Sequence, residues 1–301
     1  MGENEMIAWI RSQQATPKDG VGIGDDCAVV CSKPSWLIST DMLMDGTHFD
    51  LNKISPELAG RKSLAVSLSD IAAMGGVPKH IFISLALPEK GGDQIGKKVM
   101  GGIQKLAEPY GVSILGGDTN SWAGPLVINI TILGNPGPAK PVLRSGAKPG
   151  DRLLVTGMLG GSLESHHLHF EPRIAEALTL TSRYEIRAMA DVSDGIAKEA
   201  HLLAMESMCR VVLFPSLLPI RNNISRLSLS ERIAAAYGDG EDFELLFATT
   251  ADTAKLILSD KPLEIPITEI GYFTQGIGII EESSTGEHSS LNTRGFSHKL
   301  S

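Results

Sequence analysis

Aspartate recurs beside glycine, serine or threonine in five short segments of the sequence. These segments are Gly22-Ile-Gly-Asp-Asp26, Ser39-Thr-Asp41, Ser67-Leu-Ser-Asp70, Gly116-Gly-Asp-Thr119 and Asp191-Val-Ser-Asp-Gly195. Any one of them is explained better as a turn or a helix cap, by about three to one, because aspartate and glycine favour both. The five together indicate a site, since Asp41, Asp70 and Asp118 lie beside or within apolar runs where an unpaired carboxylate is costly.

A group of carboxylates of this kind would suit Mg²⁺. This ion prefers hard oxygen ligands, keeps several waters and is usually held by a few carboxylates together with substrate phosphates. Ser39 and Thr40 would add hydroxyl or carbonyl oxygens beside Asp41. The glycines at positions 22, 24, 116 and 117 have no side chain, so the backbone there could approach a phosphate closely. The pattern therefore predicts a magnesium site that binds a phosphorylated ligand.

The two common phosphate-binding motifs are both missing from the sequence. It contains no G-x-x-x-x-G-K-[ST] segment and no kinase-type glycine loop paired with a strand lysine. A phosphate-binding protein of another type is predicted.

Apolar periodicity predicts strands and helices that would position these aspartates. Strands are expected at residues 36–40, 81–87, 112–115, 126–133 and 152–156, and helices at residues 56–74, 93–110, 172–180 and 194–208. Asp41 and Asp118 are expected to follow strands, and Asp70 to lie within a helix. Because strands and helices alternate without the strict order of a doubly wound sheet, we predict a mixed α/β (α+β) fold.

The length of 301 residues predicts two domains, each with its own core, and a cleft between them. Proline and glycine alternate from Gly134 to Pro141, which predicts a boundary near residue 140. We expect an N-terminal domain at residues 1–140 and a C-terminal domain at residues 141–301 that completes the cleft.

Composition excludes several classes of function. The formal net charge is −8 and no run of lysine and arginine occurs, which disfavours nucleic acid as a partner. The longest apolar runs, such as residues 81–87, are too short to cross a membrane. The three cysteines lack the spacing of a disulfide framework or zinc site, which favours a cytoplasmic protein.

At the five segments the sequence resembles the thiamine-monophosphate kinase family, in the superfamily of aminoimidazole ribonucleotide synthetase. The resemblance continues through His48-Phe49, Leu143-Arg-Ser-Gly-Ala147 and Gly240-Glu-Asp-Phe-Glu-Leu-Leu-Phe247, in the family's order over nearly the whole chain. It implies a two-domain aminoimidazole ribonucleotide synthetase-like fold that forms a homodimer through its N-terminal sheets. It also implies that ATP phosphorylates thiamine monophosphate, with Mg²⁺, to give thiamine diphosphate.

The resemblance assigns roles residue by residue. The implied magnesium set is Asp25, Ser39, Thr40, Asp41, Asp70, Asp118, Asp191 and Asp194. The implied ATP contacts are Gly117, Asp118, Arg144 and Ser193. His48 and Glu241 would lie against the thiamine phosphate. Thr293 stands where the family has a tryptophan that stacks on the thiamine ring, a departure that bears on the acceptor and leaves the metal ligands intact.

The acceptor phosphate would itself be the nucleophile in such a reaction. It is largely ionised near neutral pH, because the second pKa of a phosphate monoester is about 6. We therefore expect direct in-line transfer, with no side-chain nucleophile or base and no phospho-enzyme.

Two other interpretations of the pattern stay open. One is another ATP-dependent enzyme of the superfamily, which phosphorylates a carbonyl or amide oxygen. The other is a sensor that binds ATP and Mg²⁺ without catalysis. The cluster of Glu164, His166, His167 and His169 matches no metal-ligand spacing and is expected to form an exposed polar loop, by about four to one.

Overall fold

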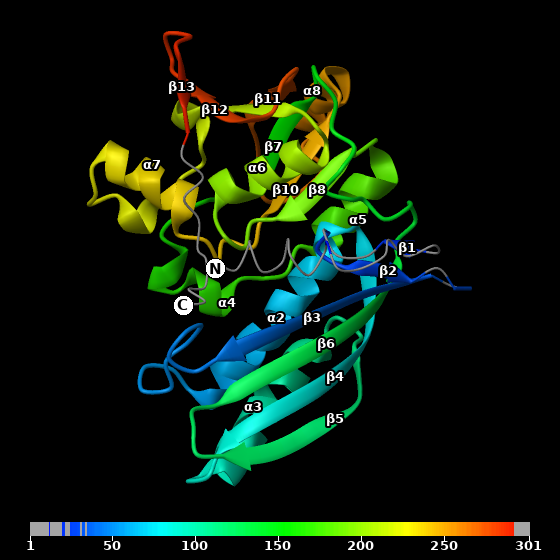
Figure 1. The fold of residues 1–301 in the computed structure, drawn as a ribbon, viewed down its shortest axis with the longest axis vertical. Coiled ribbons are helices and arrows are strands. Elements are labelled where there is room, and N and C mark those ends of the chain that lie inside the picture. The colour runs from blue at the N-terminus through cyan, green and yellow to red at the C-terminus, as the bar shows by residue number, and fades with distance from the viewer. Residues whose placement is uncertain (1–11, 13–19, 22–24, 31, 34, 292–301) are drawn as a thin grey trace.

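The computed structural model describes residues 12, 20–21, 25–30, 32–33 and 35–291. In this part of the chain, two β-sheets and the helices beside them form the fold (Figure 1). The first sheet has the order β1-β2-β3-β6-β4-β5, and the second has the order β13-β12-β9-β11-β7-β10-β8. The mixed α/β fold predicted from the sequence is confirmed.

The strands of the first sheet are β1 (Gly20–Val21), β2 (Ala28–Val30), β3 (Trp36–Met44), β4 (Gly76–Pro88), β5 (Ser113–Trp122) and β6 (Val127–Pro136). Those of the second are β7 (Arg152–Thr156), β8 (Ala188–Asp191), β9 (Arg210–Leu213), β10 (Leu245–Thr249), β11 (Ile267–Thr274), β12 (Gly278–Glu282) and β13 (His288–Ser290). The α-helices are α2 (Pro56–Ala73), α3 (Gly92–Ala107), α4 (His166–His169), α5 (Ile174–Arg183), α6 (Ile196–Glu206), α7 (Leu229–Gly238) and α8 (Ala251–Asp260).

Helix α2 connects the two halves of the fold. It begins where the Ser55 hydroxyl accepts a hydrogen bond from the Leu58 N–H, with Pro56 in the first turn, and it ends before Gly75, which has a φ of +66°. Its residues are buried on nearly every side, because it contacts β3, β4 and β6 of the first sheet and also β8, α4 and α5. Side chains on α2 can therefore meet residues of both sheets.

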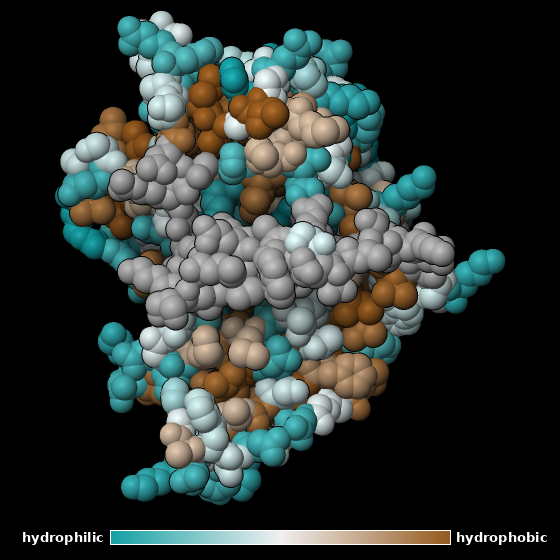
Figure 2. Space-filling view, viewed as in Figure 1, coloured by the Kyte–Doolittle hydropathy of each residue, from teal (hydrophilic) through white to brown (hydrophobic). Residues whose placement is uncertain are grey.

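The first sheet has one covered face and one open face. Along β3, Leu37 and Leu43 point toward α2 and are buried, whereas Met42 is 55% exposed on the opposite face. Phe82 on β4 is 41% exposed on that same face. Figure 2 shows some apolar residues among polar ones on the side of the molecule where this face is seen. Among the described residues, the helices pack only on the covered face.

The apolar core forms two clusters, and the larger one contains residues from both sides of residue 140. The larger cluster includes Leu64 and Leu68 of α2 together with Leu245 and Phe247 of β10. The smaller one lies between the second sheet and α6. The two sheets therefore share a continuous apolar contact through α2.

Four strands run further than the sequence predicts, and one of them is β4, which spans Gly76–Pro88 where residues 81–87 were expected. β3 continues through Asp41, β6 continues to Pro136, and β5 continues through Gly116, Gly117 and Asp118 as an edge strand. The expectation that Asp41 and Asp118 follow strands is therefore wrong, because backbone pairing with β6 and β4 extends each strand beyond its apolar run. No helix in the described ranges is long and apolar enough to cross a membrane.

Candidate active site

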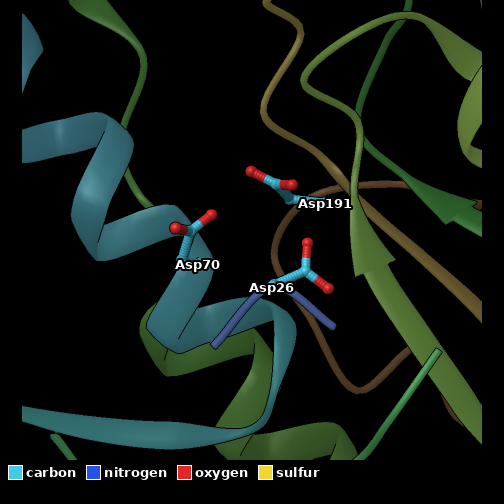
Figure 3. Close-up of side chains that lie close together, drawn as sticks. All are labelled: Asp26, Asp70 and Asp191. Carbon is cyan, nitrogen blue, oxygen red and sulfur yellow. The ribbon is translucent and has the colours of Figure 1, made fainter. Parts of the chain in front are cut away.

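Three carboxylates that are far apart in the sequence meet between the two sheets. Asp26 precedes β2, Asp70 lies near the end of α2, and Asp191 ends β8. One oxygen from each lies within 4.8 Å of the others, and Figure 3 shows the three side chains around a common space. Asp70 and Asp191 are thus brought together as the sequence predicts.

Serine hydroxyls orient the carboxylates in and around this group. Ser39 on β3 donates to Asp70, and Ser69 on α2 donates to Asp191. Asp41, whose side chain points to the α2 side of β3, accepts from Ser67 at 2.7 Å. In this structure Ser39 therefore acts as a hydrogen-bond donor to a candidate ligand, Asp70.

The carboxylates are held where their charged form is unfavourable. Burial raises the pKa of Asp41 to about 6. Burial and then the charges of neighbouring carboxylates raise the pKa values of Asp70 and Asp191 well above the usual range. A divalent cation would offset this repulsion, and an all-oxygen donor set is the kind that Mg²⁺ takes. The residues present therefore fit a magnesium site.

Arg144 compensates part of this negative charge. Its Nη2 lies 2.9 Å from Asp26 Oδ1 and its Nε lies 3.1 Å from Asp26 Oδ2, which makes a bidentate ion pair. Glu199 Oε2 is 3.7 Å from the same guanidinium, and burial raises the pKa of Glu199 to about 7. Arg144 therefore lies beside the carboxylate group, and its contact with ATP stays a prediction.

Asp26 was missed by the sequence interpretation, which named Asp25. Asp25 lies outside the three-carboxylate group, and its Oδ1 accepts the Arg144 backbone N–H at 2.6 Å. Adjacent residues in extended chain point in opposite directions, so a Gly-Asp-Asp segment does not say which carboxylate faces the site. The role of Asp25 as a ligand stays a prediction.

Asp118 and Thr40 lie on the open face of the first sheet. Asp118 is opposite Ser84 and is exposed; its oxygens accept hydrogen bonds from the Thr119 N–H and the Asn120 amide. β6 and β4 separate β5 from β3, so Asp118 is roughly 14 Å from Met42, the β3 residue in line with it. Within the described chain, Asp118 does not reach the carboxylate group.

The remaining predicted residues lie in separate parts of the fold. Asp194 and Ser193 follow Asp191 in the turn before α6, where Asp194 accepts from Lys198 Nζ at 2.5 Å. Gly117 is inside β5, where a Cβ atom would lie 1.7 Å from the Ile83 carbonyl oxygen. Close strand packing is therefore one physical reason for glycine at position 117. Gly22, Gly24 and Thr293 lie outside the described residues.

His48 and Glu241, the predicted acceptor residues, meet at Lys62. The Lys62 ammonium donates to the His48 carbonyl oxygen and to Glu241 Oε1, both at 2.6 Å. His167 Nδ1 lies 2.9 Å from Lys62 Nζ and 2.9 Å from Glu241 Oε2. Sequence reasoning missed Lys62 and assigned His167 to an exposed polar loop. Lys62 could have been identified from the sequence, because it is a charged residue within the apolar helical run that also contains Asp70.

An unusual backbone conformation presents Glu241. Glu241 and Phe243 have φ values of +53° and +50°, which non-glycine residues rarely adopt. Between them, the fully buried Asp242 pairs with Arg221 and accepts the Gly160 N–H. Strained backbone of this kind persists where surrounding contacts hold it, and it is enriched at functional sites.

The expectation of an exposed polar loop is wrong for His166 and His167. They lie in the short helix α4, which Phe170 anchors by stacking on Phe243 with ring centroids 4.2 Å apart. His166 is half-buried against the Asp242 carbonyl, and burial lowers its pKa to about 4. Glu164 and His169 are exposed, as expected.

Comparison with known proteins extends these observations. The family described as AIR synthase related protein, N-terminal domain, matches residues 24–135. A thiamine-monophosphate kinase of Rhodopirellula baltica is 36% identical over 309 residues, covering 98% of this chain and 97% of the relative. A thiamine-monophosphate kinase of Bacillus subtilis is 35% identical over 306 residues, covering 92% of this chain and 93% of the relative.

A solved structure is similar over almost the same length. It is described as AaThiL complexed with AMPPCP and TMP, and it matches with a TM-score of 0.84 and 28% identity, covering 99% of this chain and 97% of that one. The aminoimidazole ribonucleotide synthetase-like fold predicted from the sequence is confirmed. At this identity and coverage, the chain belongs to the thiamine-monophosphate kinase family.

Proposed function

We propose that this protein transfers the γ-phosphoryl group of ATP to thiamine monophosphate, giving thiamine diphosphate, with Mg²⁺ held by its carboxylates. The observation that carries the proposal is the convergence of Asp26, Asp70 and Asp191 in a chain of this family. Such a group suits a reaction in which two anionic molecules must meet.

The placement of the acceptor residues supports the same reaction. Lys62, which holds Glu241, and Asp70 lie eight residues apart on α2. Eight residues are slightly more than two turns, so both side chains are on one face, separated by roughly 12 Å along the helix axis. An acceptor bound at Glu241 could therefore extend its phosphate toward the carboxylates.

The residues of the chain would bind and orient the reactants. Asp26, Asp70 and Asp191 would hold the cation, with Asp25, Ser39, Thr40, Asp41, Asp118 and Asp194 as the further predicted ligands. Bound Mg²⁺ supplies positive charge that offsets the negative charge on the transferring phosphoryl group. Gly117, Arg144 and Ser193 are the predicted ATP contacts. No side chain needs to remove a proton, because the acceptor phosphate is already ionised.

A homodimer would allow Asp118 to contribute to the active site of a second copy. Asp118 lies on the open face of the first sheet, together with Met42 and Phe82, and the first sheet is the one predicted to contact a second copy. A two-fold contact between two such faces would place Asp118 of one copy over β3 of the other. The proposed location is the cytoplasm, where ATP is available.

A coupled assay of ATP consumption tests the proposal directly. Thiamine monophosphate, thiamine and aminoimidazole precursors are compared side by side, with and without Mg²⁺. Turnover with thiamine monophosphate alone supports the proposal. Turnover only with an acceptor carbonyl or amide would favour another enzyme of the superfamily, and ATP binding without any turnover would favour a sensor.

A further inference from the structure

Lys62 is a fully buried lysine whose ammonium group is completely surrounded by acceptors. Its side chain has no exposed surface. An ammonium has three N–H donors, and Nζ has three neighbours to receive them: the His48 carbonyl oxygen, Glu241 Oε1 and His167 Nδ1. These neighbours come from the segment before α2, from the segment before β10 and from α4. One nitrogen therefore connects three separate segments.

Stability alone does not explain a lysine at this position. An ammonium loses its hydration on burial, and replacing a buried ion pair by apolar residues is often neutral or stabilising. Position 62 lies in a helix whose other buried residues are mostly small or apolar, so an apolar side chain would suit the packing there. The ion pair with Glu241 therefore points to a role in positioning.

Glu241 is the partner whose placement matters. Its backbone is in the left-handed region and its side chain is 22% exposed, so the carboxylate is both constrained and accessible. Lys62 occupies Oε1. His167 Nδ1 lies near both groups, but a neutral ring nitrogen either accepts from Lys62 or donates to Glu241, and it cannot do both. When it accepts from Lys62, Oε2 is left for a donor on a ligand.

We infer that Lys62, together with His167, is a positioning residue for the phosphoryl acceptor. Lys62 holds the Glu241 carboxylate and the His48 backbone at a fixed separation, so that Glu241 Oε2 faces a hydrogen-bond donor of the bound acceptor. Lys62 does not touch the acceptor, because it is fully buried. This inference rests on the proposed function, and it concerns acceptor binding rather than the carboxylate group near Asp70.

The test compares the KM values of the two substrates in Lys62→Met, a change that removes the charge and preserves most of the length. Because the loss of a charged hydrogen bond leaves Glu241 free to move, KM for thiamine monophosphate should rise about tenfold or more. KM for ATP should change less than about twofold, since the Lys62 ammonium contacts His48, His167 and Glu241 and none of the predicted ATP contacts. In Lys62→Met/Glu241→Gln, KM for the acceptor should be no higher than in Glu241→Gln alone, because both changes remove the same interaction.

The matched control is Arg173→Met, which breaks another ion pair, between Arg173 and the buried Glu244. It should lower the melting temperature without changing KM for the acceptor. If Lys62→Met does not fold, His167→Gln tests the same contact, with an expected rise of about threefold or more in that KM alone.

Outcomes for the function and for the inference are separable. Wild-type protein without turnover of thiamine monophosphate would remove the proposed function. If the wild type is active but KM for the acceptor is unchanged in the folded Lys62→Met or His167→Gln variant, the role of Lys62 is overturned and the proposed function is not. Equal changes in KM for ATP and for the acceptor would also overturn the role of Lys62 only.

Discussion

The Ser69 hydroxyl on helix α2 donates a hydrogen bond to Asp191 at the end of strand β8. This contact joins a residue of one half of the fold to a carboxylate of the other. Both residues are buried, so bulk water has little access to Asp191 to replace a lost donor. The hydrogen bond therefore orients one of the three carboxylates that face the candidate magnesium site.

Removal of this donor should weaken cation binding. In Ser69→Ala the Asp191 carboxylate loses its orientation, and we expect Mg²⁺ affinity to fall by about tenfold or more, as is usual when a ligand loses its supporting hydrogen bond. Titration calorimetry with Mg²⁺ measures the effect. Ser63→Ala is the control, because Ser63 donates only to Ala59 within the same helix. Equal affinities in the two variants would contradict the expectation.

Asp41 and Asp118 should each be needed for turnover, but from different copies of the chain. Asp41→Ala or Asp118→Ala should each lower kcat by about a hundredfold or more, as is typical for the loss of an electrostatic stabiliser. When the two variants are coexpressed, a mixed dimer contains one intact site and one doubly altered site. Random assembly should then restore about a quarter of wild-type activity.

Measurement of kcat after coexpression distinguishes this arrangement from a site within one chain. If Asp118 served Asp41 in its own chain, every site in the mixture would lack one of the two carboxylates. No recovery in a mixture that contains mixed dimers would therefore rule out the contribution of a second copy.

Arg144 should stabilise the protein mainly when Mg²⁺ is absent. In Arg144→Met the buried Asp26 loses its bidentate partner, and removal of one member of a buried pair costs about 3–5 kcal/mol. Mg²⁺ should reduce this loss, because the cation takes over the compensation of charge. Urea unfolding with EDTA and with Mg²⁺ measures both values. For Arg187→Met, which breaks the ion pair with Asp151, the loss should be the same in both buffers.

Stability without Mg²⁺ should fall as pH rises from about 4 to about 6. Burial raises the pKa of Asp41 from 3.8 to about 6, so the folded protein binds more protons than the unfolded chain in this window. The contribution of protonated Asp41 to the free energy of unfolding is fully present below about pH 4 and is lost as the pH passes about 6. Melting temperatures measured across this range in EDTA should show the decline. Asp41→Asn should make it shallower, while Asp70, Asp191 and Glu199, whose pKa values are also raised, still contribute. Mg²⁺ should raise the melting temperature more at pH 8 than at pH 5.

Gly117 and Gly116 should differ in their tolerance of alanine. A Cβ atom at Gly117 would lie 1.7 Å from the Ile83 carbonyl oxygen, which no small shift can relieve, whereas one at Gly116 would be 3.8 Å from the Phe82 ring. Gly117→Ala should therefore lower the melting temperature clearly, and Gly116→Ala should leave it almost unchanged. Similar melting temperatures for both would show that β5 does not pack on β4 in this way.

Elements with strong local signals were predictable from the sequence. The start of α2 follows from the Ser55 cap and Pro56, and the span of β7 agrees with the predicted residues 152–156. Strand ends were less predictable. β4 begins at Gly76 because Gly76 pairs with Pro136 of β6, and pairing between distant segments leaves no local signal.

The sequence by itself determined the types of side chain available, the segments that carry them and, through resemblance, the family. Only the tertiary structure decided that Asp26 rather than Asp25 joins Asp70 and Asp191, that Lys62 holds Glu241, and that Asp118 lies on the open face. The physical reason is that local sequence governs backbone conformation within a few residues. Which carboxylates share a space, and which charges are buried together, depends on how segments more than a hundred residues apart pack around α2.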